Sequence, residues 1–385
     1  MAIFGSLVIT SCKKEPGTAS VTTPTPKDPN ECVSGQSVES PIIPGTYIVE
    51  LNNGVVTNKS TIASMSISQD VLERNDIDQT KIAGIFTGEQ GGFVAKLSSD
   101  EAVKLSNDPS VKTIEPDRVV SLGTTCFTIA APTLITWNVK RVGYGDGTGK
   151  TAWILDTGID YDHPDLNVDK TRSRTFITGG TTANDDNGHG THVAGIIGAL
   201  NNNIGVLGVA SGASLVSLKV LGADGKGTLS TIVQALSYID QNAAAGDVVN
   251  MSFGLDGSST VLDDQIENIA ARGIYFSIAA GNDGKAANTI SPANANGPNI
   301  YTVSAIDSLD RFASFSNFGN DVVDYAQPGV NILSTYFGGR YAWISGTSMA
   351  TPHLTGLLLL KGKNLNVSGS AKNDPDGTPD PIAHY

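Results

Sequence analysis

The chain has 385 residues, a formal net charge of −13, 39% hydrophobic residues and 43 glycines. This length suffices for one large domain and a smaller one, and the apolar content is that of a globular protein. The charge excludes the basic surface that nucleic-acid binding requires, so we expect no nucleic-acid partner. The three cysteines form no C-x-x-C pair, so no zinc or redox motif is expected.

Residues 1–12 contain a short apolar run that ends at Ser11-Cys12 and is too short to span a bilayer. The run resembles a bacterial lipoprotein processing box, in which the cysteine is lipidated; the alternative is an ordinary signal fragment that is removed. A lipid on Cys12 would leave Cys32 and Cys126, which could form a disulfide or remain free. Residues 13–44 are rich in Pro and Thr and predict a linker without a core.

Residues 45–122 predict a small α/β domain. A helix-start signal at residues 98–101 and a stop at Asp108-Pro109 bound its second helix. The pattern predicts the order β-α-β-β-α-β of a ferredoxin-like fold, with strands at 45–51, 81–86, 92–97 and 111–120 and the first helix at 60–74. The alternative is a free-standing binding domain. Residues 123–136 predict a small-residue linker that a protease could cut.

Residues 137–362 predict a parallel sheet with helices on both faces, because short apolar strands alternate with helical stretches. The expected strands are 151–155, 214–220, 248–252, 274–279 and 300–305, and the expected helices are 189–200, 228–245, 262–272 and 347–361. Residues 363–385 form a polar tail, expected as a docked surface loop or a frayed end.

Three segments carry candidate catalytic residues: Asp156 ends an apolar strand, His189 opens an apolar helix between glycines, and Ser348 lies at the start of the last helix. Each alone could be a cap or a turn residue. Together they supply a nucleophile, its base and a carboxylate that orients the base. The order Asp, His, Ser differs from that of chymotrypsin and of α/β-hydrolases. A metal pair of His189 and His192 lacks the glutamate of H-E-x-x-H and a third ligand.

The stretches DTGID, NGHGTHVAG, VVNMSFG, AAGN and GTSMATPH closely resemble, in the same order, motifs of the subtilisin-like serine proteases. The resemblance covers about residues 137–362 and implies the α/β fold of that family. It implies that Asp156 orients and balances His189, that His189 is the general base and then the general acid, and that Ser348 attacks the scissile carbonyl. It also implies that the Asn282 side chain and the Ser348 N–H bind the oxyanion of an acyl-transfer reaction.

The same resemblance implies that substrate binds as an added β-strand between two chain segments. Small residues around the main specificity pocket imply that it accepts large uncharged side chains. The residues implied at the strand edges and the pocket are Gly225, Gly227, Ser252, Phe253, Gly254, Ala279, Ala280 and Gly281.

Residues 200–208, LNNNIGVLG, closely resemble the calcium loop of this family. Oxygen ligands from one loop suit Ca²⁺. The implied ligands are the side chains of Asp165 and Asn202 and the carbonyls of Leu200, Ile204 and Val206; the alternative is a polar surface turn. No organic cofactor is expected.

Residues 45–122 look like the inhibitory propeptide of this family. The resemblance implies an intramolecular inhibitor that lays its C-terminal strand in the active site and is removed by self-cleavage between about Val120 and Ala131. We therefore expect a monomeric, secreted or envelope-attached endopeptidase that acts on proteins and peptides. A catalytically silent binding protein and an esterase-like serine hydrolase are the alternatives.

Overall fold

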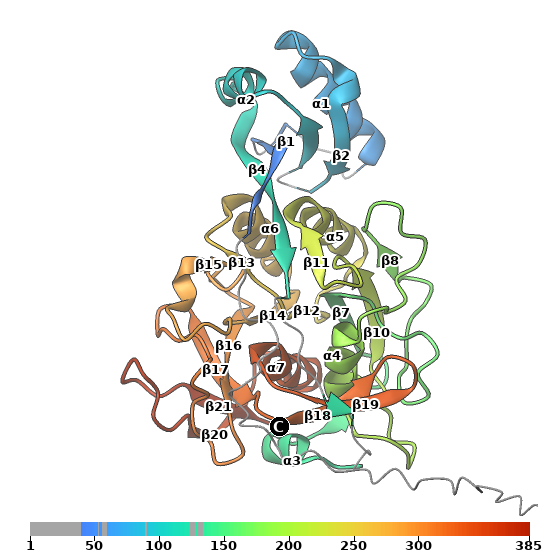
Figure 1. Ribbon diagram of the computed structural model, residues 1–385, viewed down its shortest axis with the longest axis vertical. Coiled ribbons are helices and arrows are strands. Elements are labelled where there is room, and N and C mark those ends of the chain that lie inside the picture. Colours follow the sequence, from blue (N-terminus) through green and yellow to red (C-terminus); the bar gives the residue numbers. More distant parts are fainter. Residues whose placement is uncertain (1–39, 53, 56–59, 89–90, 123–127, 130–133) are drawn as a thin grey trace, which may run out of the picture.

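The computed structural model describes residues 40–385 except 53, 56–59, 89–90, 123–127 and 130–133. Two sheets dominate this part of the chain, a smaller antiparallel one and a larger, mostly parallel one, and one long strand runs from the first to the edge of the second (Figure 1). Cys12, Cys32 and Cys126 lie outside the described residues.

The smaller unit has the predicted order of elements. It consists of β1 (Ile42–Leu51), α1 (Thr61–Arg74), β2 (Ile82–Phe86), β3 (Gly92–Lys96), α2 (Ser99–Ser106) and β4 (Val111–Ser121). Side chains alternate across the sheet: Val49 and Phe93 belong to a core with Leu72 of α1, whereas Ile48 and Val94 belong to the core shared with the larger unit. The ferredoxin-like pattern is thereby confirmed.

The helix-start signal before α2 is a complete capping box. Ser98 Oγ accepts a hydrogen bond from Glu101 N at 3.3 Å, and the Glu101 carboxylate accepts one from Ser98 N at 2.8 Å. These two bonds satisfy N–H groups that a helix start otherwise leaves unpaired.

The larger sheet has nine strands within the described residues, in the order β20-β21-β17-β16-β14-β12-β7-β10-β8. Its central strands are parallel to one another. The strands are β7 (Thr151–Asp156), β8 (Arg174–Thr175), β10 (Ser214–Lys219), β12 (Val248–Met251), β14 (Tyr275–Ala279), β16 (Ile300–Ile306), β17 (Val323–Pro328), β20 (Asn366–Ser370) and β21 (Pro381–His384).

Helices cover both faces of this sheet, as the alternating pattern predicted. Ile154 of β7 shares a core with α4 (His189–Gly198) and α7 (Thr347–Lys361). Trp153, the preceding residue, faces the core formed with α5 (Leu229–Asn242) and α6 (Thr260–Ala270). Both faces are buried, which explains why the strands read as continuous apolar runs.

None of the helices in the described ranges has the length and apolar character of a membrane span. Short elements connect the layers of the two units. The connecting elements are η1 (Gln79–Lys81), β5 (Thr128–Ile129), α3 (Trp137–Val142), β6 (Gly145–Asp146), β9 (Ala210–Ser211), β11 (Lys226–Thr228), β13 (Leu255–Asp256), η2 (Ala287–Thr289), β15 (Ile290–Ser291), β18 (Ile332–Tyr336) and β19 (Arg340–Ile344).

The C-terminal tail is neither a loop nor a frayed end. Strands β20 and β21 pair with each other, and β21 also pairs with β17 of the main sheet. Ile382 and Ala383 are fully buried. Only three apolar side chains in the last few residues support this strand, which is too short a run to predict from the sequence.

Candidate active site

Asp156 and His189 form a buried pair at the carboxyl edge of the main sheet. His189 Nδ1 lies 2.9 Å from both carboxylate oxygens of Asp156, and both side chains are fully buried. Thr157 N donates to Asp156 Oδ1 at 2.7 Å. Because the carboxylate accepts from Nδ1–H, the other ring nitrogen, Nε2, is the one able to take up a proton. Nε2 is buried and has no hydrogen-bond partner among the described residues.

Glycines allow α4 to approach the end of β7 closely enough for this pair to form. A Cβ atom at Gly190 would lie 2.1 Å from the carbonyl oxygen of Gly158 and 3.0 Å from the Cβ of Asp156. Gly188, which precedes the helix, has φ of 114°, a conformation that favours glycine. The pattern Gly-His-Gly is therefore a requirement of the close packing that brings His189 to Asp156.

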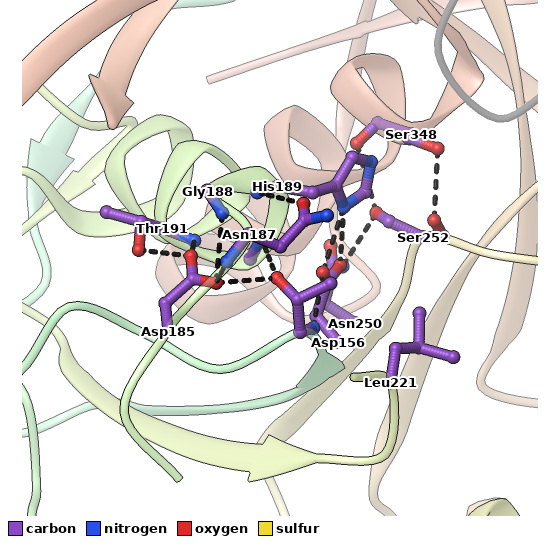
Figure 2. A network of polar contacts seen from close by, with 12 residues as sticks. Asp156, Asp185, Asn187, Gly188, His189, Thr191, Leu221, Asn250, Ser252 and Ser348 are labelled. Atoms are coloured by element: carbon purple, nitrogen blue, oxygen red, sulfur yellow. Dashed lines mark hydrogen bonds and ion pairs between the residues drawn. The ribbon is translucent and has the colours of Figure 1, made fainter. Parts of the chain in front are cut away.

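Ser348 lies in the first turn of α7, and Figure 2 shows it at the same end of the main sheet as the Asp156–His189 pair. Its hydroxyl donates to the carbonyl oxygen of Ser252 at 3.0 Å, and Ser252 Oγ donates to the carbonyl oxygen of Ser348 at 3.0 Å. The Ser348 hydroxyl therefore donates its hydrogen bond to Ser252 and not to His189. Pairing with Nε2 requires the Ser348 hydroxyl to give up its bond to Ser252, and such Ser–His bonds are often absent or long before substrate binds.

Asn282 follows β14 at the same edge of the sheet and is 2% exposed. Its Oδ1 accepts hydrogen bonds from Thr347 N at 2.8 Å and from Thr347 Oγ1 at 2.9 Å. With Oδ1 engaged, the amide Nδ2 is the end that can donate to a substrate oxygen. Asn282 and Ser348 line one pocket, so an amide group and a hydroxyl group face the same cavity.

The pocket walls agree only in part with the sequence prediction. Phe253, Gly254, Ala279 and Gly281 line it, whereas Ala280 is fully buried in a cluster with Ala287 and Ala293. Successive residues of an extended segment point to opposite sides, which is why Ala280 turns away between its two neighbours. Five further lining residues were not predicted from the sequence, namely Ser121, Leu255, Asp283, Ile290 and Thr347.

Strand β4 of the smaller unit occupies the two edges predicted for a substrate strand. Val120 pairs with Gly227 and Ser121 with Lys226 on one side, and Ser121 bridges to Gly254 on the other. The N–H of Leu122 donates to the carbonyl oxygen of Gly225 at 2.8 Å. Figure 1 shows β4 reaching from the smaller unit to the edge of the main sheet. The main-chain groups that could hold a peptide are thus occupied by this strand.

Two carboxylates of β4 anchor the smaller unit on two helix starts. Glu115 accepts from Ser259 Oγ at 2.9 Å and from Val261 N at 3.0 Å, at the start of α6. Asp117 accepts from Ser230 N at 3.0 Å and from Ser230 Oγ at 2.6 Å, at the start of α5. The partial positive charge of a helix N-terminus favours an anion there. Burial raises the pKa of both carboxyl groups.

The candidate cation ligands gather around Asp165. Its Oδ2 accepts from Val206 N at 2.9 Å, while its Oδ1 is buried without a hydrogen-bond partner among the described residues. Burial raises the pKa of Asp165 to about 6. Asn202 Oδ1 accepts from Ile204 N at 3.1 Å. No group of three or more His, Cys, Asp or Glu side chains suited to a metal occurs in the described ranges, so a cation here would depend on backbone carbonyls.

Two families match the chain, in the order in which the two units occur. Residues 46–123 match the family Peptidase inhibitor I9, and residues 147–371 match the Subtilase family. The chain is 46% identical to Subtilisin BL of Lederbergia lenta, over 60% of this chain and 85% of that protein. It is 41% identical to the M-protease of Shouchella clausii (strain KSM-K16), over 70% of this chain and 68% of that protein.

Two further similarities cover either more of this chain or nearly all of the related chain. The chain is 35% identical to Alkaline serine exoprotease A of Vibrio alginolyticus over 82% of its own length, and it spans 60% of that relative. A crystal structure of a cold adapted subtilisin-like serine proteinase superposes with a TM-score of 0.58 at 32% identity, over 66% of this chain and 98% of that chain.

Substitution of Gly190 by alanine tests the close packing of α4 against β7. The added methyl group collides with backbone, which cannot yield as a flexible side chain would. We expect a loss of about 1–3 kcal/mol in the free energy of unfolding, measured by denaturant titration, and a larger relative loss in turnover. The matched control is Gly297→Ala, since its φ is not in the left-handed region and the nearest atom to a Cβ there, the Ile300 Cδ1, lies at an ordinary contact distance of 3.8 Å. Equal activity of the two variants would contradict the packing argument.

Proposed function

Since the chain belongs to the Subtilase family, we propose that it acts as a serine endopeptidase through Asp156, His189, Ser348 and Asn282. The observation that carries this proposal is the 2.9 Å contact of Asp156 with Nδ1 of His189, at the sheet edge where Ser348 is hydrogen-bonded to Ser252. A carboxylate in that position fixes the tautomer that leaves Nε2 available as a base.

The proposed reaction is an acyl transfer in two stages. Ser348 turns its hydroxyl to Nε2 of His189, loses its proton to that nitrogen, and its Oγ attacks the scissile carbonyl carbon. Nδ2 of Asn282 and the N–H of Ser348 stabilise the oxyanion, and His189 returns the proton to the leaving amine. Water then cleaves the acyl-enzyme with His189 again as base. Removal of one oxyanion donor typically lowers the rate by about 10²–10³-fold.

We further propose that residues 45–122 are an inhibitory propeptide domain, which the enzyme itself removes by a cut between about Val120 and Ala131. The pairing of β4 with Gly227 and Gly254 supports this, because a substrate strand would use the same main-chain groups. These strand-pairing edges also disfavour an esterase, because an ester substrate does not need main-chain strand pairing to bind. Residues 137–362 would form the catalytic domain, and the pairing of β21 with β17 supports including residues 363–385 with it.

Substitution of Ser348 by alanine tests self-processing. The variant retains the fold but has no nucleophile, so we expect it to remain full length, whereas the wild type releases a fragment of about the size of residues 1–122. N-terminal sequencing and mass measurement of both purified proteins provide the readout. Spontaneous maturation of the variant would rule out self-cleavage, and an uncut wild type would favour a catalytically silent binding protein.

The pocket composition supports a preference for large uncharged side chains. Phe253, Ala279, Gly281 and Ile290 line it, with Asp283 as its only ionisable lining residue in the described part of the chain. We expect a library of peptides to show the fastest cleavage after Leu, Phe, Tyr or Met. A strict requirement for Arg or Lys would contradict this preference.

Raising the pH should loosen the cut propeptide. Burial raises the pKa of Glu115 and Asp117 above their ordinary values, and it raises that of Glu50, beside Lys112, to about 7. A carboxyl group whose pKa is higher in the docked state favours docking below its free value, and that contribution is lost as the pH rises through the docked value. We therefore expect weaker retention across the window from about pH 4 to about pH 7.

The retention of the cleaved fragment on the catalytic domain, measured by size-exclusion chromatography at constant ionic strength, tests this response. The double variant Glu115→Gln/Asp117→Asn should show a flatter pH dependence than the wild type, since Glu50 alone remains to titrate. If the wild-type catalytic domain retained more of the fragment as the pH rises, the predicted direction of the pH dependence would be wrong.

We propose a structural Ca²⁺ site held by the side chains of Asp165 and Asn202 and by the carbonyls of Leu200, Ile204 and Val206. The buried oxygen of Asp165 without a partner supports it, since a cation would compensate an otherwise unpaired carboxylate oxygen. When bound, the ion supplies no chemistry; it ties residues 200–206 to Asp165.

Chelation tests the site. We expect excess chelator to lower the midpoint of thermal inactivation by several degrees and added Ca²⁺ to restore it, since a ligand that binds only the folded state stabilises it. Asp165→Asn should abolish the difference between the two conditions. If chelator left the midpoint of thermal inactivation of the wild type unchanged, the proposed Ca²⁺ site would be contradicted.

We also propose that the enzyme is monomeric and acts outside the cell or at the cell envelope, on proteins and peptides. The apolar run before Cys12 supports export, and Cys12 is the candidate for lipid attachment. Cys32 and Cys126 are candidates for a disulfide. Intact-mass analysis of the exported protein, with and without reductant, decides both modifications.

A further inference from the structure

A buried carboxylate that the proposed reaction does not use lies behind the Asp156–His189 pair. Asp185 is 5% exposed and precedes His189 by four residues. The described residues give its carboxylate five donors: Thr157 Oγ1 at 2.9 Å, Asn187 N at 3.0 Å, Gly188 N at 3.0 Å, Thr191 N at 3.0 Å and Thr191 Oγ1 at 2.5 Å.

These bonds join the two elements that carry the catalytic pair. Thr157 directly follows Asp156 at the end of β7, and Thr191 lies in the first turn of α4, which begins at His189. Thr157 Oγ1 also accepts from Gly190 N at 3.0 Å, so this hydroxyl bridges Asp185 and the helix. Figure 2 shows Asp185 on the opposite side of the pair from Ser348. The network therefore fixes the helix start against the strand end.

The contacts favour the ionised form of Asp185, although burial raises the pKa of this carboxyl group. Three of the five partners are backbone N–H groups, which can only donate, and both carboxylate oxygens accept from at least one of them. Three of the donors are backbone N–H groups at the start of α4, where an anion is stabilised. The other charged or titratable groups around Asp185 and His189 are Asp156 on β7, His192 on α4, Lys219 on β10, Asp186 in the loop and Tyr336 at the end of β18.

We propose that Asp185 is a positioning residue for the peptidase reaction. Its carboxylate holds the start of α4 on the end of β7, so that the imidazole of His189 faces Asp156 on one side and Ser348 on the other. Its negative charge, at fixed distance behind the pair, stabilises the imidazolium that forms when Ser348 gives up its proton. This inference rests on the proposed function, because it needs His189 to act as a base.

The variant Asp185→Asn keeps the shape of the side chain and removes its charge. The matured enzyme is used, with its concentration determined by active-site titration. We expect kcat to fall by about 10–100-fold, by analogy with the loss of a hydrogen-bond partner that orients a metal-binding histidine. KM should change little, because Asp185 does not line the pocket. The acid limb of kcat/KM, which follows protonation of the base, should move to lower pH by roughly half a unit or more.

Two further variants separate charge from shape. Asp185→Glu retains the charge, so its acid limb should stay near that of the wild type even if kcat is reduced. Thr157→Val removes the bridging hydroxyl without altering any charge, so kcat should fall while the acid limb stays in place. This second variant also keeps the inference testable if Asp185→Asn does not fold.

The matched control is Asp380→Asn. Asp380 is a carboxylate of similar burial, 3% exposed and bonded to Ser304 Oγ in the C-terminal part of the chain. Its loss should leave kcat per titrated site and the acid limb unchanged. An unshifted acid limb in Asp185→Asn, or a kcat in Asp185→Asn or Thr157→Val equal to that of the wild type, would overturn the inference. An inactive wild type would instead remove the proposed function.

Discussion

The contact between the Asp156 carboxylate and Nδ1 of His189 is the constraint on which the rest of the site depends. Both groups are fully buried, so each needs the other to compensate the loss of water. Bringing a helix start onto a strand end at this distance requires glycine at 190 and a cap for the helix. Asp185 provides that cap. The carboxyl edge of the parallel sheet then presents Ser252 and Asn282 alongside, since β12 and β14 end there.

The smaller unit docks on the same edge of the sheet. Strand β4 pairs with Gly227 and Gly254, Leu122 directly after it donates to Gly225, and two carboxylates of β4 accept hydrogen bonds at the starts of α5 and α6. Main-chain bonds on two sides and carboxylate bonds at two helix starts fix the position of this strand. These contacts do not depend on any side chain in the pocket. Because the anchors are buried carboxylates, docking and protonation are coupled.

Much of this organisation could be predicted from the sequence, because the long apolar strands, the capping box at Ser98 and the Gly-His-Gly pattern are local signals. The fold class and the family resemblance are confirmed. Other features could not be predicted. The strand β21 is only four residues long, the Ser348 rotamer depends on an acceptor at Ser252, and Ile290 reaches the pocket only through the tertiary fold. Asp185 resembles an ordinary turn residue in the sequence, since its five donors come together only on folding.

Labelling with a fluorophosphonate probe, followed by peptide mapping, tests most directly whether the three residues act as one unit. We expect the matured wild type to be labelled at Ser348. We expect a His189→Ala variant, shown to be folded and freed of its N-terminal fragment by an added protease, not to be labelled at a comparable rate. Labelling of Ser348 at the wild-type rate without the imidazole, or no labelling of an active wild type at Ser348, would contradict the account.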